Sequence, residues 1–221
     1  MEGTGKMIDS STGESEVLTP SCVSLILASG SSARQTLLRD SGVAFTVRTQ
    51  AIDESLYKEA GRQAGESAAS VALRLAAAKA EAVSRETGQR DAFVIGADQM
   101  LSCEGEWFDK PVSRQSAREQ LCRLRGRTHF LHSAVVLCRG GETVWSHIEE
   151  PKLMMRDFSD TFLDAYLEVE GEACFASVGA YRLEGPGIQL FSRIEGEYSA
   201  ILGLTLLPLF AALRSLGILA S

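Results

Sequence analysis

Apolar and polar positions follow two different periods along the first half of the chain. Mostly apolar runs of strand length cover residues 23–29 and 92–98, which is typical of buried central strands. Residues 34–42 have a short helical pattern, and residues 43–53 return to a strand pattern. The clearest helix is the alanine-rich stretch 65–88, which ends at a glycine. This alternation of strands and helices predicts an α/β fold.

The second half of the chain adds a longer hairpin. Residues 128–150 predict two long strands joined at Gly140 and Gly141. Helical patterns follow at residues 159–171 and from about Leu206 onward. We therefore expect a mixed, twisted sheet flanked by helices, with the inserted long hairpin forming a second lobe.

The first twenty residues differ in composition from the rest. They are polar, rich in serine, threonine, glycine and glutamate, and they lack the apolar segment of a signal peptide. We expect a disordered N-terminal extension over residues 1–20, because so little apolar surface cannot offset the entropy lost on ordering. One domain is expected over residues 21–221, which is long enough to bury a substantial core.

Charge and cysteine content narrow the class of protein. The formal net charge of −7 argues against sequence-independent binding of nucleic acid, which requires a basic surface. No apolar run approaches the roughly 20 residues that span a bilayer, so we expect no membrane partner. The five cysteines are odd in number, scattered and never arranged as CxxC, which favours reduced thiols in a cytoplasmic protein.

Small residues fill the turn between the first predicted strand and the helix that follows it. In the segment LASGSSAR, residues 28–33 would let backbone N–H groups approach an anion at the start of that helix. Ser29 and Ser31 can add hydroxyl donors, and Arg34 can add a fork of N–H groups for phosphate. A serine N-cap followed by a surface arginine explains the same residues, so this stretch alone leaves both interpretations open.

A lysine interrupts the apolar stripe of the alanine-rich helix. Lys79 lies four residues from both Leu75 and Val83, so the three side chains share one helix face. A cation in an apolar stripe is costly unless it is paired or binds an anion. A side chain that snorkels at the edge of the stripe is the alternative.

Carboxylates stand at the ends of two predicted strands. Asp98 ends one of them, and Asp53 and Glu54 end the other. Ligands of open α/β sheets gather at the carboxyl ends of strands, and two carboxylates there would suit a Mg²⁺ ion that binds phosphates. Lys110, just after a predicted hairpin, would supply a second cation. The alternative is that the carboxylates and Lys110 are ordinary turn residues at the surface, without a role in binding.

Two histidines lie three residues apart in a predicted strand. Because side chains alternate along a strand, His129 and His132 should point to opposite faces of the sheet. We therefore expect structural roles for both and no joint metal site.

Eight short segments, in one order along the chain, resemble the Maf family of nucleoside triphosphate pyrophosphatases. They run from about Val23 to Leu216 and are LASGSSAR, IDE, RLAAAKA, IGADQ, DKP, LRGRTH, GAYRLEG and IEGEYSAILGL. One such segment would be weak evidence, whereas eight in family order are specific. The resemblance implies a Maf/ITPase-like fold, a homodimer, and hydrolysis of a nucleoside triphosphate to monophosphate and pyrophosphate with Mg²⁺ or Mn²⁺.

The resemblance also implies roles for individual residues. Asp98 resembles the catalytic carboxylate that ligates the metal or acts as a base toward water, and Glu54 resembles its metal partner. Arg34, Lys79 and Lys110 resemble the groups that hold the triphosphate. Such cations would bind the charge that shifts onto the leaving pyrophosphate while the carboxylate positions water.

Three positions bear on which base the site accepts. The family often has paired arginines after the serine loop, but Ala33 precedes a single arginine here. Gln99 and Glu184 resemble the branch that acts on 7-methyl-GTP, whereas the dTTP and UTP branch usually carries threonine and glutamine there. A carboxylate can accept both N1–H and N2–H of guanine, and its charge favours the cationic methylated ring. The resemblance thus implies a modified nucleotide such as 7-methyl-GTP, with a dTTP/UTP-preferring enzyme as the alternative.

Two other classes of protein explain parts of the same pattern. A nucleotidyltransferase also places a glycine-rich loop after its first strand, but such loops usually continue to a nearby lysine, and the first lysine after this loop is Lys58. A non-enzymatic nucleotide-binding regulator of cell division is the second alternative, because the family name carries that association. The presence of Asp98, Glu54 and the two lysines favours an enzyme.

Overall fold

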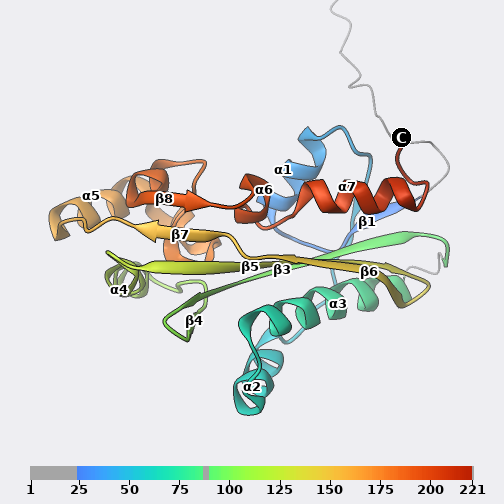
Figure 1. The fold of residues 1–221 in the computed structure, drawn as a ribbon, viewed down its shortest axis with the longest axis horizontal. Coiled ribbons are helices and arrows are strands. Elements are labelled where there is room, and N and C mark those ends of the chain that lie inside the picture. The colour runs from blue at the N-terminus through green and yellow to red at the C-terminus, as the bar shows by residue number, and fades with distance from the viewer. Residues whose placement is uncertain (1–23, 87–89, 221) are drawn as a thin grey trace, which may run out of the picture.

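The computed structural model describes residues 24–86 and 90–220, and within them one mixed sheet runs along the molecule (Figure 1). The strand order is β2-β1-β3-β5-β7-β8, with β4 paired to β3 and β6 paired to β5. β1 is parallel to β2 and β3, and the other pairs are antiparallel. The strands are β1 (Leu25–Leu27), β2 (Thr46–Val47), β3 (Phe93–Cys103), β4 (Glu106–Phe108), β5 (Thr128–Arg139), β6 (Glu142–Glu149), β7 (Lys152–Met155) and β8 (Phe191–Glu195).

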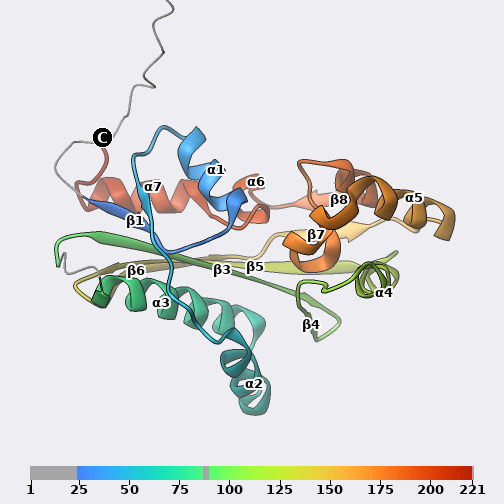
Figure 2. The ribbon, with the colours of Figure 1, turned by 180° about the vertical axis from the view of Figure 1, so that it is seen from behind.

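Helices cover both faces of the sheet. α3 lies along one face, against β3, β5 and β6, while α1 and α7 lie on the opposite face (Figures 1 and 2). The expected α/β fold, a mixed sheet flanked by helices, is therefore confirmed. The helices are α1 (Ser32–Asp40), α2 (Glu54–Ala64), α3 (Ala68–Glu86), α4 (Arg114–Leu124), α5 (Asp160–Glu170), α6 (Tyr198–Ile201) and α7 (Leu206–Ser215), with 3₁₀ segments η1 (Gly171–Ala176), η2 (Val178–Ala180) and η3 (Pro186–Leu190).

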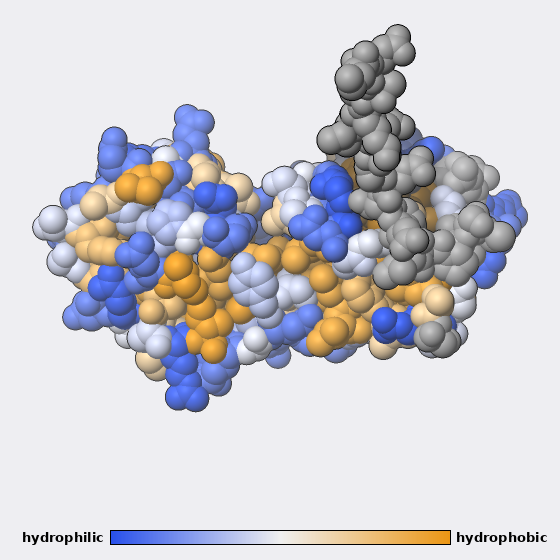
Figure 3. Space-filling model, turned by 90° about the horizontal axis from the view of Figure 1, so that it is seen from above, coloured by the Kyte–Doolittle hydropathy of each residue, from blue (hydrophilic) through white to orange (hydrophobic). Residues whose placement is uncertain are grey.

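The expected long hairpin forms, but it stays within the sheet. β5 and β6 turn at Gly140 and Gly141, whose φ angles are 60° and 87°, and β6 pairs along β5. The second lobe is built instead by the far ends of β3 and β5 with β4, β7, β8, α4 and α5. Its own core includes Leu121, Leu153 and Leu163. Seen from above, the surface is hollowed between this lobe and the rest of the molecule (Figure 3).

Small residues bring α3 close to β3. A Cβ added to Gly96 of β3 would lie 2.1 Å from the carbonyl oxygen of Ala76 on α3, so only glycine permits this approach. The contact lies one helical turn from Lys79 and two residues from Asp98. Close packing of the helix on the strand therefore determines how near these two charged side chains come.

The strand expected over residues 43–53 is wrong for most of its length. Only Thr46–Val47 pair with β1, and both residues are exposed. Asp53 caps α2, accepting a hydrogen bond from the backbone of Ser55, and Glu54 is the first residue of that helix. α2 fully buries only Gly61, so most of its surface lies outside the core. The extension expected over residues 1–20 lies outside the described residues.

Candidate active site

A cleft of about 1430 Å³ opens where the β1–α1 turn, the start of α2, the middle of β3 and the segment before β8 meet. Every site residue predicted from the sequence lines it. These residues are Ser29, Ser31, Ala33, Arg34, Glu54, Lys79, Asp98, Gln99, Lys110 and Glu184. The fold thus brings together side chains that are spread over more than 150 residues of sequence.

Lys79 bridges the two predicted carboxylates. Its Nζ lies 2.6 Å from Asp98 Oδ1 and 2.6 Å from Glu54 Oε1. The side chain of Asp98 is 7% exposed, and that of Lys79 is 17% exposed. The lysine in the apolar stripe is therefore paired inside the cleft and does not snorkel to the surface.

The two carboxylates have opposite pKa shifts. Burial raises the pKa of Asp98, although Lys79 and Arg34 act in the other direction. Burial also acts to raise the pKa of Glu54, but hydrogen bonding and charge from Lys79, with further charge from Lys58, outweigh it and lower that pKa. Glu54 is thus held as a carboxylate, while Asp98 is the group poised to take up a proton.

Arg34 connects three parts of the cleft wall. Its Nε donates to the carbonyl oxygen of Gly203 at 2.7 Å, and one terminal nitrogen donates to Ser29 Oγ at 3.2 Å and to the carbonyl oxygen of Ala97 at 3.1 Å. Burial lowers its pKa, opposed by the charges of Asp98 and Glu54. Two of its three nitrogens therefore bind the protein itself, so Arg34 fixes the β1–α1 turn as well as adding charge.

The serine loop combines both interpretations of its sequence. Ser31 is the N-cap of α1, and its hydroxyl accepts from the backbone N–H of Arg34 at 3.5 Å. The backbone N–H of Ser31 donates to Ser29 Oγ at 3.3 Å. The same loop lines the cleft at the start of a nine-residue helix. A capped turn and a wall of the cleft are here the same structure.

The two residues expected to read the base occupy different settings. The side-chain amide nitrogen of Gln99 contacts Ser133 Oγ at 2.8 Å and the carbonyl oxygens of Ala200 and Ile201 at 3.0 Å each. This leaves its amide oxygen as the group that can meet a ligand. Glu184 is exposed in the turn that precedes η3. Its charge acts on the neighbouring Arg182 and contributes to raising the pKa of that guanidinium.

Sequence reasoning missed two cations that line the cleft, Lys58 and Arg182. Lys58 of α2 lines it, and its Nζ lies 2.6 Å from Asp109 Oδ1 and 3.8 Å from Glu54 Oε2. The spacing of four residues between Glu54 and Lys58 is the signal that could have found it, because this spacing brings side chains together on a helix. The incorrect strand assignment before Glu54 hid that relationship.

The donor set suits a hard divalent cation that binds together with a phosphate. Within the described part of the chain, no three His, Cys, Asp or Glu side chains form a group that could hold a metal. Glu54 and Asp98 provide two carboxylates on either side of one lysine. Mg²⁺ is commonly held by one or two carboxylates plus substrate phosphates, so this pair fits it.

The two histidines of β5 contact different partners, as their spacing predicts. His129 is fully buried and its Nε2 lies 2.9 Å from the hydroxyl of Tyr181. His132 lies between Ser102 and Glu150, with 2.7 Å contacts to each. No atom of either histidine lines the cleft.

Comparison with known proteins places the chain in a family. The family model described as Maf-like protein matches residues 24–216. The chain is 52% identical over 198 residues to a nucleoside triphosphate pyrophosphatase of Gluconobacter oxydans, covering 90% of this chain and 97% of that protein. It is 49% identical over 193 residues to a 7-methyl-GTP pyrophosphatase of Rhizobium meliloti, covering 87% of this chain and 96% of that protein.

Among solved structures, a nucleoside-triphosphatase (dITP/XTP pyrophosphatase) from Mycobacterium abscessus is similar with a TM-score of 0.42 and 16% identity, covering 88% of this chain and 96% of that one. In the described residues, every helix is too short or too polar to cross a membrane. The family match and the two relatives each cover most of the chain. The chain therefore belongs to the Maf-like protein family.

Proposed function

We propose that this protein hydrolyses a nucleoside triphosphate between its α and β phosphates, releasing a monophosphate and pyrophosphate. It is a hydrolase acting on phosphoric anhydrides. The observation that carries the proposal is Lys79 held between Glu54 and Asp98 in a cleft that also contains Lys110 and Arg34. The names of the relatives from Gluconobacter oxydans and Rhizobium meliloti support it.

The chemistry follows from where the charges lie. Water attacks the α phosphorus, the bond to the bridging oxygen breaks, and the electron pair leaves with pyrophosphate. Asp98 positions the water and takes its proton, which suits a buried carboxylate whose pKa is raised. Lys79, Lys110 and Arg34 stabilise the charge that gathers on the leaving group. A divalent metal held by Glu54 and Asp98 would supply further positive charge at the phosphates.

The substrate we propose is a modified nucleotide such as 7-methyl-GTP. Glu184 lines the cleft and can accept two N–H groups of a guanine edge, and its charge attracts a methylated, cationic ring. The name of the Rhizobium meliloti relative supports this substrate. A preference for dTTP and UTP is the alternative, because a uracil edge offers one N–H between two carbonyl oxygens.

We further propose a cytoplasmic homodimer. The four cysteines in the described residues are all free thiols, which supports a reducing compartment. Leu207 of α7 is 70% exposed, and burying this apolar side chain against a second copy would stabilise such a contact. Light scattering on the protein as it elutes from a size-exclusion column measures the mass in solution. One chain has a mass of 23.8 kDa, so a measured mass near 24 kDa would exclude the dimer.

The activity is tested by supplying 7-methyl-GTP, dTTP, UTP and the other canonical triphosphates with Mg²⁺ in H₂¹⁸O. We expect pyrophosphate, no orthophosphate, and ¹⁸O only in the monophosphate, because water attacks the α phosphorus. Label in pyrophosphate would place the attack at the β phosphorus and contradict the proposal. Transfer of the nucleotide to a second substrate would favour a nucleotidyltransferase, and binding without turnover would favour a regulator.

A further inference from the structure

A second lysine connects two parts of the cleft that lie far apart in the sequence. Lys58 lies one helical turn after Glu54 on α2, and its side chain is 17% exposed. Its Nζ lies 2.6 Å from Asp109 Oδ1 and 3.8 Å from Glu54 Oε2. α2 and the turn after β4 are thus joined by one ammonium group.

Lys58 is largely buried, whereas the carboxylates that it faces are half-exposed, 42% for Glu54 and 55% for Asp109. Exposed ion pairs contribute little because water and salt screen them. A lysine as buried as Lys58 cannot solvate its charge freely, so its Nζ is confined between the two carboxylates that face it. The contact therefore links the segments that carry Glu54 and Asp109.

Asp109 directly precedes Lys110, which we propose to bind the triphosphate. Besides Lys58, Asp109 contacts Arg62 of α2, with Oδ2 3.8 Å from the guanidinium, and its backbone carbonyl accepts from Gln120 of α4 at 2.8 Å. Lys110 itself is exposed, so the location of its ammonium group depends on the backbone from which it extends. Fixing Asp109 fixes that backbone.

The two oxygens of Glu54 face different lysines. Oε1 lies 2.6 Å from Lys79, and Oε2 lies 3.8 Å from Lys58. When another group engages one oxygen, the other still faces a cation, so the carboxylate keeps its orientation. Lys58 therefore acts on Glu54 and on Lys110 through separate contacts.

We propose that Lys58 is a positioning residue of the triphosphate site, which sets the geometry between Glu54 and Lys110 by binding Glu54 and Asp109 together. This inference rests on the proposed pyrophosphatase function. Lys58 makes no contact with the reacting phosphate in this account. Its loss misplaces groups that do, and small misplacements reduce binding and turnover strongly.

The test compares Lys58→Met, Lys58→Arg and Asp109→Asn in the full chain. With the best triphosphate substrate, we expect Lys58→Met to raise KM about tenfold and to raise the Mg²⁺ concentration for half-maximal rate. Asp109→Asn should raise KM and leave the Mg²⁺ requirement unchanged, because Lys58 still faces Glu54. Lys58→Arg should recover most of the loss. A double variant that carries Lys58→Met and Asp109→Asn should have the KM of Lys58→Met alone, since both changes remove the same contact.

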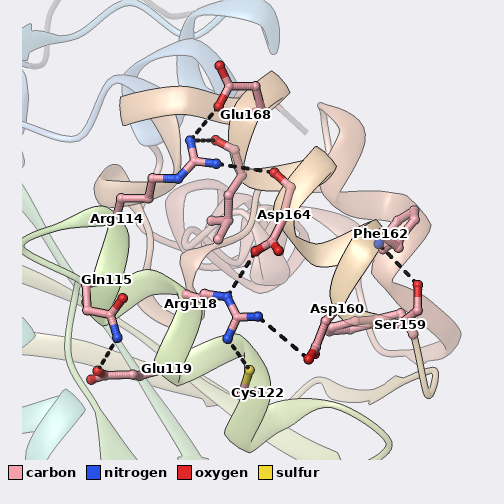
Figure 4. A network of polar contacts seen from close by, with 12 residues as sticks. Arg114, Gln115, Arg118, Glu119, Cys122, Ser159, Asp160, Phe162, Asp164 and Glu168 are labelled. Atoms are coloured by element: carbon pink, nitrogen blue, oxygen red, sulfur yellow. Dashed lines mark hydrogen bonds and ion pairs between the residues drawn. The ribbon is translucent and has the colours of Figure 1, made fainter.

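Arg118→Met is the matched control. Arg118 of α4 pairs with Asp164 of α5 at 3.0 Å, a link between two helices that lies away from the cleft (Figure 4). This variant should keep both the wild-type KM and the Mg²⁺ requirement. Circular dichroism shows whether each variant folds. If Lys58→Met does not fold, the role of Lys58 is judged from Asp109→Asn, which should still raise KM, and from Lys58→Arg, which should remain close to the wild type.

The outcomes separate the two proposals. An active wild type with Lys58→Met unchanged in KM and Mg²⁺ requirement, or changed no more than Arg118→Met, overturns the role of Lys58 and leaves the proposed function intact. A wild type that releases pyrophosphate from no triphosphate overturns both.

Discussion

Gly96 of β3 lies against the backbone of Ala76 on α3, with room for no Cβ: an added one would be 2.1 Å from the Ala76 carbonyl oxygen. This contact sets how close Lys79 comes to Asp98. Gly96→Ala must push α3 outward, which costs about 1–3 kcal/mol in the free energy of unfolding. We expect urea denaturation to show a decrease of that size in the free energy of unfolding. The turnover rate should fall by a larger fraction than the free energy of unfolding.

A second change shows whether the backbone or a side chain is the obstacle at this contact. The added Cβ would also lie 2.7 Å from the Cβ of Ala80. Ala80→Gly should not rescue Gly96→Ala, because the closest atom belongs to the backbone of Ala76. Full recovery of stability in the double variant would contradict this explanation.

Removing Lys79 leaves two carboxylates close together. Breaking a buried ion pair by deleting one partner costs about 3–5 kcal/mol, so Lys79→Met should lose stability in that range and lose pyrophosphatase activity. Adding Asp98→Asn removes the unpaired buried charge and should restore part of the stability, but none of the activity. Chemical denaturation of both variants measures the difference. If the double variant is the less stable of the two, Asp98 is not the partner that Lys79 neutralises.

His129 makes stability depend on pH below neutrality. Burial lowers its pKa to about 4, and its Nδ1 has no hydrogen-bond partner among the described residues. The unfolded chain takes up a proton near pH 6.5, whereas the folded chain does not until about pH 4, so stability falls as pH falls through this window. The loss reaches about 3 kcal/mol by pH 4. His129→Gln should show a shallower dependence in denaturation curves between pH 7.5 and 4.5, and identical slopes would contradict this account.

Glu184 is the most direct test of base preference. Glu184→Gln keeps the size of the side chain but replaces one acceptor oxygen by a donor, which suits a carbonyl oxygen of uracil or thymine. We expect kcat/KM for 7-methyl-GTP to fall about tenfold or more and the value for dTTP and UTP to rise or hold. A variant with unchanged ratios would mean that another residue reads the base.

The sequence predicts the parts of the site that depend on local pattern. Lys79 stands out because it interrupts an apolar helix stripe, and Asp98 because it follows an apolar run. The bonds of Arg34 could not be foreseen, since its acceptors Gly203 and Ala97 lie 169 and 63 residues away. Their positions depend on how α7 and β3 pack, and the pattern of apolar and polar residues along the chain does not reveal that packing.

α2 illustrates the opposite limit. The helix packs chiefly on α3 and fully buries only Gly61, so little of its surface belongs to the core of the sheet. The relation between Glu54 and Lys58 becomes visible only once the helix is known. The hairpin of β5 and β6 was predicted correctly from its two glycines, but its membership of the main sheet depends on strand pairing far along the chain.

The central claim is that Asp98, paired with Lys79, drives release of pyrophosphate from a nucleoside triphosphate. The most direct measurement is pyrophosphate release with Mg²⁺ by the wild type, Asp98→Asn, and the control Asp91→Asn, whose side chain is 93% exposed and pairs with Arg139 outside the cleft. We predict a loss of about a hundredfold or more for Asp98→Asn, with its fold intact, and none for Asp91→Asn. Turnover by folded Asp98→Asn at the wild-type rate would contradict the account.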